Sequence, residues 1–127
     1  METHVHDAFF ALITDAERRY VVSQNGFVIN LFEDPSEELQ LAAVGQWGSA
    51  IHYIKNPTEQ VKLAAVMADG RAIKAIENPT EQVQLGAVTQ NAHVIDIIED
   101  PSEAVQLAAV TQTWWALLYI KDRSEAV

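Results

Sequence analysis

Residues 35–56 read PSEELQLAAVGQWGSAIHYIKN, and residues 57–78 repeat them as PTEQVKLAAVMADGRAIKAIEN. The same pattern returns as PTEQVQLGAVTQNAHVIDIIED at 79–100 and as PSEAVQLAAVTQTWWALLYIKD at 101–122. Self-similarity at a fixed period is typical of repeat proteins, in which each unit packs against its neighbours along a stack. The chain is therefore expected to present a shaped surface rather than a single deep pocket.

The repeat organises all 127 residues into one predicted domain, residues 1–127. Four regular units of 22 residues cover 35–122, and a degenerate unit in the same register precedes them at 13–34. Residues 1–12 are expected to form an N-terminal capping segment, and 123–127 restart the pattern without its proline. Degenerate terminal units are expected of a stack, because its ends meet solvent instead of another unit.

Each regular unit opens with residues that favour the start of a helix. Asp or Asn precedes every proline and is expected to be the N-cap, with proline at the first helical position, where its missing N–H costs nothing. The glutamate two residues later would then stand at the third helical position and complete a capping box. The first unit has no proline but carries Thr14 and Glu17 at the spacing of a capping box.

Glycine in the middle of the unit predicts the end of this first helix. Gly26, Gly48 and Gly70 are expected at the left-handed position that follows a helix. A second, shorter helix follows, with apolar residues at i, i+1 and i+4 on one face. In the last unit Trp114 replaces glycine, so residues 102–121 form either one nearly continuous helix or a turn of another geometry. We predict an all-α fold without strands: a short right-handed α-solenoid of about five helix–turn–helix repeats.

The stretches Leu41 to Val44, Leu63 to Val66, Leu85 to Val88 and Leu107 to Val110, with Gln90, Asn91 and Gln112, carry a recurring motif. The motif resembles the L-A-A-V-x-Q-N-G core of a short two-helix repeat found in bacterial, phage and protist proteins of uncharacterised function. The resemblance covers residues 14–122. More loosely, the unit is similar to HEAT repeats and leucine-rich-variant repeats, which implies an α-solenoid that binds other macromolecules.

The composition narrows the possible partners. The chain has 18 acidic and 8 basic residues and a formal net charge of −10. Phosphate backbones and anionic membranes both attract Lys and Arg, so we expect neither direct nucleic-acid binding nor membrane docking. The chain has no cysteine and no apolar run of about 18 residues, the length that spans a bilayer. These features are those of a cytoplasmic protein, and they leave other proteins, including basic ones, as partners.

No constellation of side chains predicts an enzyme or a cofactor. His4, His6 and Asp7 could contribute to a metal site, but a solvated terminal segment is the favoured interpretation because no fourth ligand is evident. His52 and His93 stand at different repeat positions, without a serine or cysteine at a useful spacing. We therefore predict no catalytic residues, no metal and no cofactor.

The second helices carry the most variable positions of the repeat. Counted from each proline, positions 15, 18 and 19 change from unit to unit, whereas the framework around them stays constant. Solenoids present binding surfaces in this way, and the leading hypothesis is a non-enzymatic protein-binding module. Ordinary solvated surface is the competing interpretation. The predicted partner-binding residues are His52, Tyr53, Arg71, Lys74, His93, Asp96, Trp114, Trp115 and Tyr119.

The recurring glutamates support an alternative. Glu37, Glu59, Glu81 and Glu103 would form an acidic ridge along one edge of the stack. A rigid acidic ridge can imitate a nucleic-acid backbone and occupy the basic cleft of another protein, as an inhibitor encoded by a phage and directed at host defence would. The competing interpretation is local, since each glutamate also favours the positive end of its own helix.

Two further sets of residues have open interpretations. Trp114 and Trp115 form either a lid over the end of the solenoid or a patch for homo-oligomer formation. Glutamine recurs at position 12 in Gln24, Gln46, Gln90 and Gln112. These amides are expected to be structural, satisfying orphan carbonyls at the helix end or pairing with the same residue in the next unit.

Overall fold

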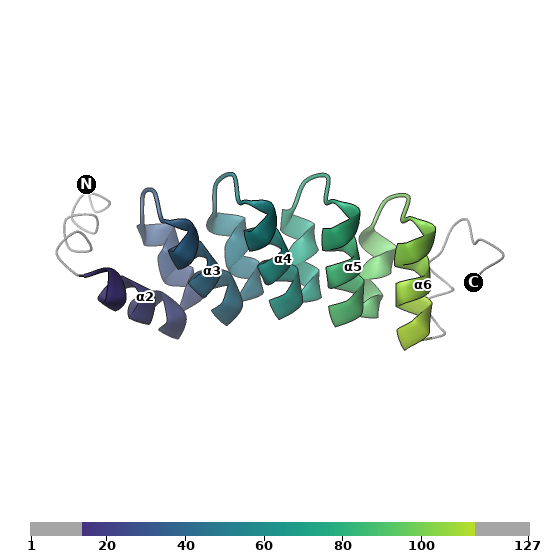
Figure 1. Ribbon diagram of the computed structural model, residues 1–127, viewed down its shortest axis with the longest axis horizontal. Helices are drawn as coiled ribbons and strands as arrows, with labels where there is room; N and C mark the ends of the chain where they lie inside the picture. The colour runs from purple at the N-terminus through teal and green to yellow at the C-terminus, as the bar shows by residue number, and fades with distance from the viewer. Residues whose placement is uncertain (1–13, 114–127) are drawn as a thin grey trace.

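The computed structural model describes residues 14–113, which form an all-helical solenoid (Figure 1). Each of the first four units contributes a ten-residue α-helix and a six-residue 3-10 helix, and the last described helix is the ten-residue α-helix of the fifth unit. The α-helices are α2 (Asp15–Gln24), α3 (Glu37–Gln46), α4 (Glu59–Ala68), α5 (Glu81–Gln90) and α6 (Glu103–Gln112). The 3-10 helices are η1 (Gly26–Leu31), η2 (Gly48–Tyr53), η3 (Gly70–Ala75) and η4 (Ala92–Ile97). The predicted all-α repeat fold is thus confirmed for this part of the chain.

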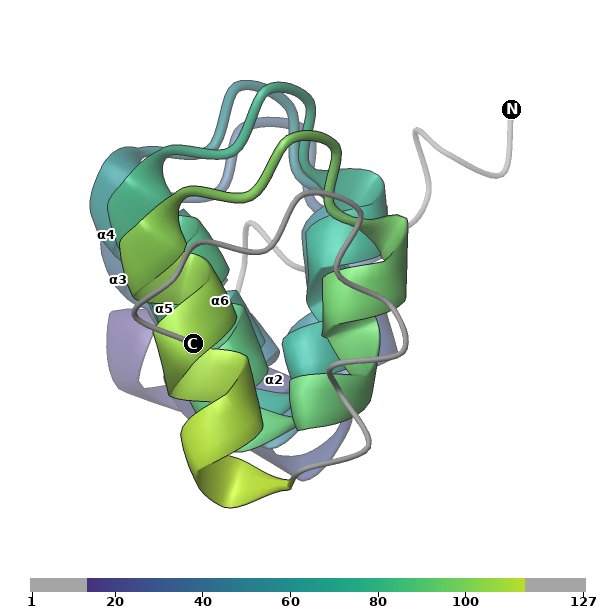
Figure 2. The ribbon, with the colours of Figure 1, turned by 90° about the vertical axis from the view of Figure 1, so that its right-hand side faces the viewer.

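The helices form two layers, which the view along the stack separates (Figure 2). The α-helices lie on one side and the 3-10 helices on the other, and the loops that enter each α-helix cross between the layers at one edge. Each α-helix packs against the next α-helix and against the 3-10 helix of the unit before it. The core between the layers consists mainly of Val, Ala and Ile, with Ala43, Ala65, Ala87 and Ala109 fully buried.

The prediction for the helix starts is wrong by two residues in the four regular units. The N-caps are Ser36, Thr58, Thr80 and Ser102, each of which accepts a hydrogen bond from the backbone N–H three residues later. The prolines therefore precede the caps, and the glutamates stand at the first helical position instead of the third. The first unit does match its prediction, because Thr14 and Glu17 form a reciprocal capping box.

Three of the four residues expected as N-caps form a left-handed turn instead. Asn56, Asn78 and Asp100 have φ values of 50°, 49° and 47°, in the left-handed region. Asn and Asp enter this region more readily than other non-glycine residues. They reverse the chain between the 3-10 helix and the next proline. The recurrence of Asn or Asp at this repeat position therefore reflects the turn. The Ser or Thr two residues later caps the helix.

The predicted left-handed glycine at the helix end is also wrong. No glycine between residues 14 and 113 has a positive φ, and the residue after each α-helix is extended. Gly26, Gly48 and Gly70 instead begin the 3-10 helices at points of close approach between units. A Cβ atom on them would lie 2.7, 2.6 and 2.5 Å from the carbonyl oxygens of Ala43, Ala65 and Ala87, respectively. Glycine is required there because a neighbouring backbone occupies the space of a side chain.

The last described unit settles the alternative left open for residues 102–121. Helix α6 ends at Gln112, and Thr113 is extended like the other C-cap residues. Residues 102–121 are therefore not one continuous helix.

Candidate functional site

The variable positions of the second helices face solvent. A 3-10 helix has three residues per turn, so positions 15 and 18 lie one above the other on the same side. The described members of the predicted site are all exposed: His52 and Tyr53 on η2, Arg71 and Lys74 on η3, and His93 and Asp96 on η4. Trp114, Trp115 and Tyr119 lie outside the described residues, as do His4, His6 and Asp7.

Three aromatic side chains gather at one end of this surface, and we call Phe27, Trp47 and Tyr53 the aromatic cluster. Their exposed fractions are 43%, 38% and 37%, which is high for side chains of this size. Phe27 and Tyr53 meet edge to face with ring centroids 5.2 Å apart, and Trp47 lies 6.4 Å from Phe27 and 6.1 Å from Tyr53. Contiguous apolar surface of this kind is typical of protein-interaction sites.

Trp47 occupies a position that other units use for capping. Asn25, Asp69 and Asn91 each follow an α-helix and accept a hydrogen bond from the backbone N–H two residues later, at 3.0 Å. Trp47 cannot accept such a bond, and η2 has no side-chain cap. Trp47 is not among the binding residues predicted from the sequence. The missing Asn or Asp at this repeat position is the signal that would have marked it.

A hollow of about 580 Å³ adjoins the aromatic cluster and runs between η2 and η3. Trp47, His52, Asp69, Arg71 and Lys74 contribute to its lining. Asp69 accepts from Arg71 three times, from the backbone N–H at 3.0 Å and from two side-chain nitrogens at 3.3 and 3.4 Å. Burial alone would raise the pKa of Asp69, but the hydrogen bonds and charge of Arg71 outweigh it and lower that pKa. Asp69 is therefore ionised and paired at neutral pH.

The predicted acidic ridge is present as a regular series with local hydrogen bonds. Glu37, Glu59 and Glu81 each accept a hydrogen bond from the hydroxyl that caps the next helix, at 2.6, 2.5 and 2.5 Å. These bonds join adjacent units and leave the carboxylates exposed. Each glutamate thus links two units and also stands at a helix N-terminus, where a negative charge is favourable.

Acidic residues concentrate on the edge where the loops enter the α-helices, the upper edge in Figure 1. We call segments 32–38, 54–60, 76–82 and 98–104 the acidic edge. Lys55 is the one basic residue in these four segments. The ten acidic residues there are all exposed: Glu33, Asp34, Glu37, Glu38, Glu59, Glu77, Glu81, Glu99, Asp100 and Glu103.

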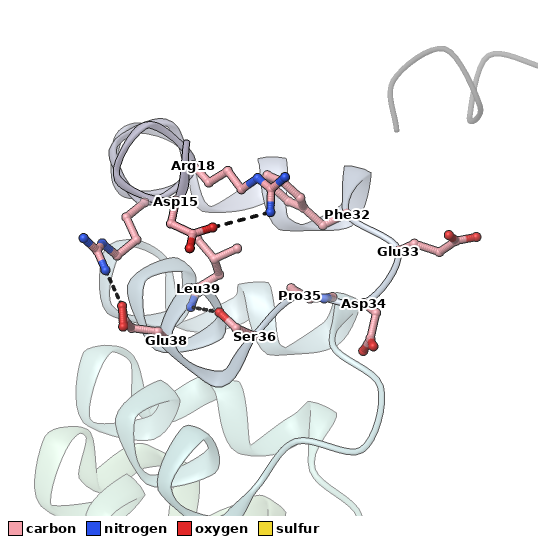
Figure 3. Close-up of a pocket in the computed structure, with 10 residues that line it drawn as sticks. Asp15, Arg18, Phe32, Glu33, Asp34, Pro35, Ser36, Glu38 and Leu39 are labelled. Carbon is pink, nitrogen blue, oxygen red and sulfur yellow. Dashed lines mark hydrogen bonds and ion pairs between the residues drawn. The ribbon is translucent and has the colours of Figure 1, made fainter. Parts of the chain in front are cut away.

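A second hollow lies at the first junction, between α2 and the start of α3 (Figure 3). Its two arginines already have acidic partners, since Arg18 pairs with Asp15 at 3.6 Å and Arg19 pairs with Glu38. Figure 3 shows the Arg18 side chain directed towards Asp15. The two arginines stand where most regular units have glutamine and leucine, so this hollow is a feature of the degenerate first unit.

The predicted structural role of the position-12 glutamines is confirmed for Gln46, Gln90 and Gln112. Gln46 and Gln90 accept hydrogen bonds from the backbone N–H groups of Gly26 and Gly70, at 2.7 and 2.6 Å. Gln112 donates to the carbonyls of Val88 and Thr89, near the end of α5. The amides thus connect adjacent units, although the three residues are exposed.

The remaining observations add no chemical group to the site. Within residues 14–113, no three His, Asp or Glu side chains come together so that they could hold a metal ion. No helix in the same range has the length and apolar character that crossing a membrane requires. Comparisons with known families, with curated proteins and with solved structures gave no match.

Proposed function

We propose that the chain is a non-enzymatic protein-binding module and that its binding surface is the aromatic cluster with the adjoining hollow. The surface combines exposed Trp and Tyr with Arg, the residue types that most often dominate interface energies. It stands on a framework of rigid, repeated packing, which presents side chains without a large ordering cost. The resemblance to solenoid repeats and the cytoplasmic location expected from the sequence are part of the same proposal.

The observation that carries the proposal is Trp47. A helix cap contributes about 1 kcal/mol of stability, and the second unit gives up this cap and exposes an indole instead. Natural sequences depart from local structural rules mostly where function requires it. A binding role explains why a large aromatic side chain stands at a position suited to Asn or Asp.

The test is affinity capture from a cell lysate with the full chain and with Trp47→Asn. The variant restores the residue type found at the same position in Asn25 and Asn91, so the fold is retained. Tyr20→Asn is the matched control, because Tyr20 on α2 is 66% exposed and lies outside the aromatic cluster. We expect a partner that wild type and Tyr20→Asn retain and that Trp47→Asn loses. A set of bound proteins that is identical for all three chains would refute the proposal.

The charge distribution favours a second candidate function, an acidic inhibitor of a nucleic-acid-binding protein. Outside the acidic edge, residues 14–113 contain four acidic residues and five basic ones: Asp15, Glu17, Asp69 and Asp96, against Arg18, Arg19, Lys62, Arg71 and Lys74. The negative charge of this part therefore lies almost wholly on one edge. Such an edge would steer a basic cleft towards it and would lose affinity steeply with added salt.

The second candidate is tested by combining Glu37→Gln, Glu59→Gln and Glu81→Gln. Glutamine keeps an oxygen that accepts the hydroxyl bond from the next unit, so the variant removes charge and preserves the link. An inhibitor predicts that the triple variant loses its partner and that high salt releases it from wild type. Unchanged capture by the triple variant would exclude the acidic ridge as the site.

A further inference from the structure

The surface of the second helices changes its chemistry along the stack. Its first part is aromatic, with Phe27, Trp47 and Tyr53 in mutual contact. Its next part is basic, with Arg71 and Lys74 on η3. The hollow between η2 and η3 is lined by residues of both parts. A ligand in this hollow therefore meets an indole face and two cationic side chains at the same time.

The hollow carries an excess of positive charge. Asp69 is its one carboxylate, and that carboxylate is bonded to Arg71. Lys74 is exposed and takes part in none of the ion pairs found between residues 14 and 113. None of the ten acidic residues of the acidic edge lines this hollow. Lys74 is therefore the cation of the hollow that no ion pair of the described residues engages.

The geometry of the rings argues against a cationic ligand. A site that encloses a methylated lysine or another organic cation needs ring faces set apart around the charge. Here Phe27 and Tyr53 pack edge to face at 5.2 Å, which leaves no space between them. Lys74 and Arg71 would repel a cation in the neighbouring hollow as well. The rings are arranged to support an apolar side chain on their outer surface.

From this arrangement we infer that the hollow binds an acidic segment of a partner protein, in which an apolar side chain precedes or follows Asp or Glu by a few residues. The apolar side chain packs on Trp47, and the carboxylate pairs with Lys74 and with the outward N–H groups of Arg71. The inference rests on the proposed function and adds the chemistry of the partner.

The test is selection of random twelve-residue peptides displayed on phage against the immobilised full chain, with Trp47→Asn as the counter-selection. We expect the Trp47-dependent peptides to be rich in Asp and Glu next to Leu, Ile, Phe or Trp. Peptides rich in Lys and Arg, or without an excess of either charge, would overturn the inference and leave the proposed function standing. A selection without any Trp47-dependent peptide would overturn both.

The affinity of one selected peptide then isolates the charge term. Lys74→Gln should weaken binding about two- to fivefold, the effect of losing an ion pair between exposed groups. Lys62→Gln, on α4 and outside the hollow, is the control and should leave affinity within twofold. Equal affinities of wild type and Lys74→Gln, with binding still lost in Trp47→Asn, would show that the surface binds apolar peptides without recognising carboxylate.

Discussion

The junctions at Gly48 and Gly70 are the same in packing and different in hydrogen bonding. Both glycines bring their backbone against the next unit, where a Cβ atom would lie 2.6 Å from the Ala65 oxygen or 2.5 Å from the Ala87 oxygen. The Gly70 N–H bonds to Gln90, and η3 is capped by Asp69. At Gly48 the next unit offers Ala68 in place of glutamine, and Trp47 supplies no cap.

The difference separates what the repeat requires from what it merely favours. Close approach is kept at both junctions because stacking depends on it. The hydrogen bond to the glutamine side chain and the side-chain cap of the 3-10 helix each contribute about 1 kcal/mol of stability. A unit can therefore lose both without unfolding the stack. Both are missing beside the aromatic cluster, where exposed side chains also gather. The junction with the poorer hydrogen bonding is thus the one next to the candidate site.

The largest expected effect is at the contact that both junctions share. Gly70→Ala places a Cβ atom 2.5 Å from the Ala87 carbonyl oxygen, and a rigid helix backbone cannot yield as a side chain would. We expect a loss of about 1–3 kcal/mol in the free energy of unfolding, the usual cost of overpacking. Urea unfolding followed by circular dichroism measures it.

The control for this substitution is Gly45→Ala, which adds the same methyl group to the interior of α3. No atom lies within 4 Å of a Cβ built at Gly45, and alanine favours a helix by about 0.8–1 kcal/mol over glycine. This variant should gain stability. If Gly70→Ala also proves neutral, the spacing between units adjusts to a methyl group at this position, and the predicted overpacking is wrong.

The hydrogen-bond difference between the junctions can be exchanged by substitution. Gln90→Ala should lose about 1 kcal/mol because the Gly70 N–H then has no acceptor. Ala68→Gln should gain about 0.5–1 kcal/mol by providing the Gly48 N–H with the amide oxygen that Gly26 and Gly70 have. Urea unfolding measures both. A loss of stability in Ala68→Gln would mean that Trp47 and its neighbours leave no room for the amide.

Trp47→Asn compares a cap with an aromatic contact. The asparagine restores a cap worth about 1 kcal/mol, and the lost ring contacts with Phe27 and Tyr53 are worth about 0.5–1.5 kcal/mol. We expect the free energy of unfolding, measured by thermal unfolding, to stay within about 1 kcal/mol of the wild-type value. A loss of several kcal/mol would make Trp47 a structural residue and would remove the main support for the binding site.

The sequence predicts the fold well because packing of the repeat leaves a periodic trace. The 22-residue period, the two helices and the buried positions such as Ala50, Ile51 and Ile54 all follow from it. The helix starts were misplaced because two types of capping residue stand two positions apart, and only the three-dimensional turn selects the hydroxyl. The prediction of left-handed glycines was wrong because glycine is selected both where φ is positive and where a neighbouring backbone leaves no space for a side chain. The sequence alone does not distinguish these two causes.

The candidate site was predicted in part. The exposure of the variable positions follows from the periodicity of the second helices. Trp47 was not singled out, since its importance depends on contacts with Phe27 and Tyr53, one of which belongs to another unit. Contacts between units are fixed by how the units stack, and a repeat pattern read along one unit does not contain them.

The smallest expected effect concerns Asp69, because among the described units only the third caps its 3-10 helix with a carboxylate. Asp69 has a lowered pKa in the folded chain, so its ionised form stabilises the fold above the ordinary pKa near 4. This contribution disappears as the pH falls through the lowered value.

Asp69→Asn keeps a cap oxygen but loses the charge. The difference in unfolding free energy between wild type and Asp69→Asn should therefore be a few tenths of a kcal/mol at pH 7 and vanish once the pH is below the lowered pKa. In an Arg71→Gln background the pH dependence of that difference should shrink, because Arg71 supplies the charge and hydrogen bonds that lower the pKa. An unchanged pH dependence would assign the stabilisation to the cap alone and make the second and third units differ only in hydrogen bonding.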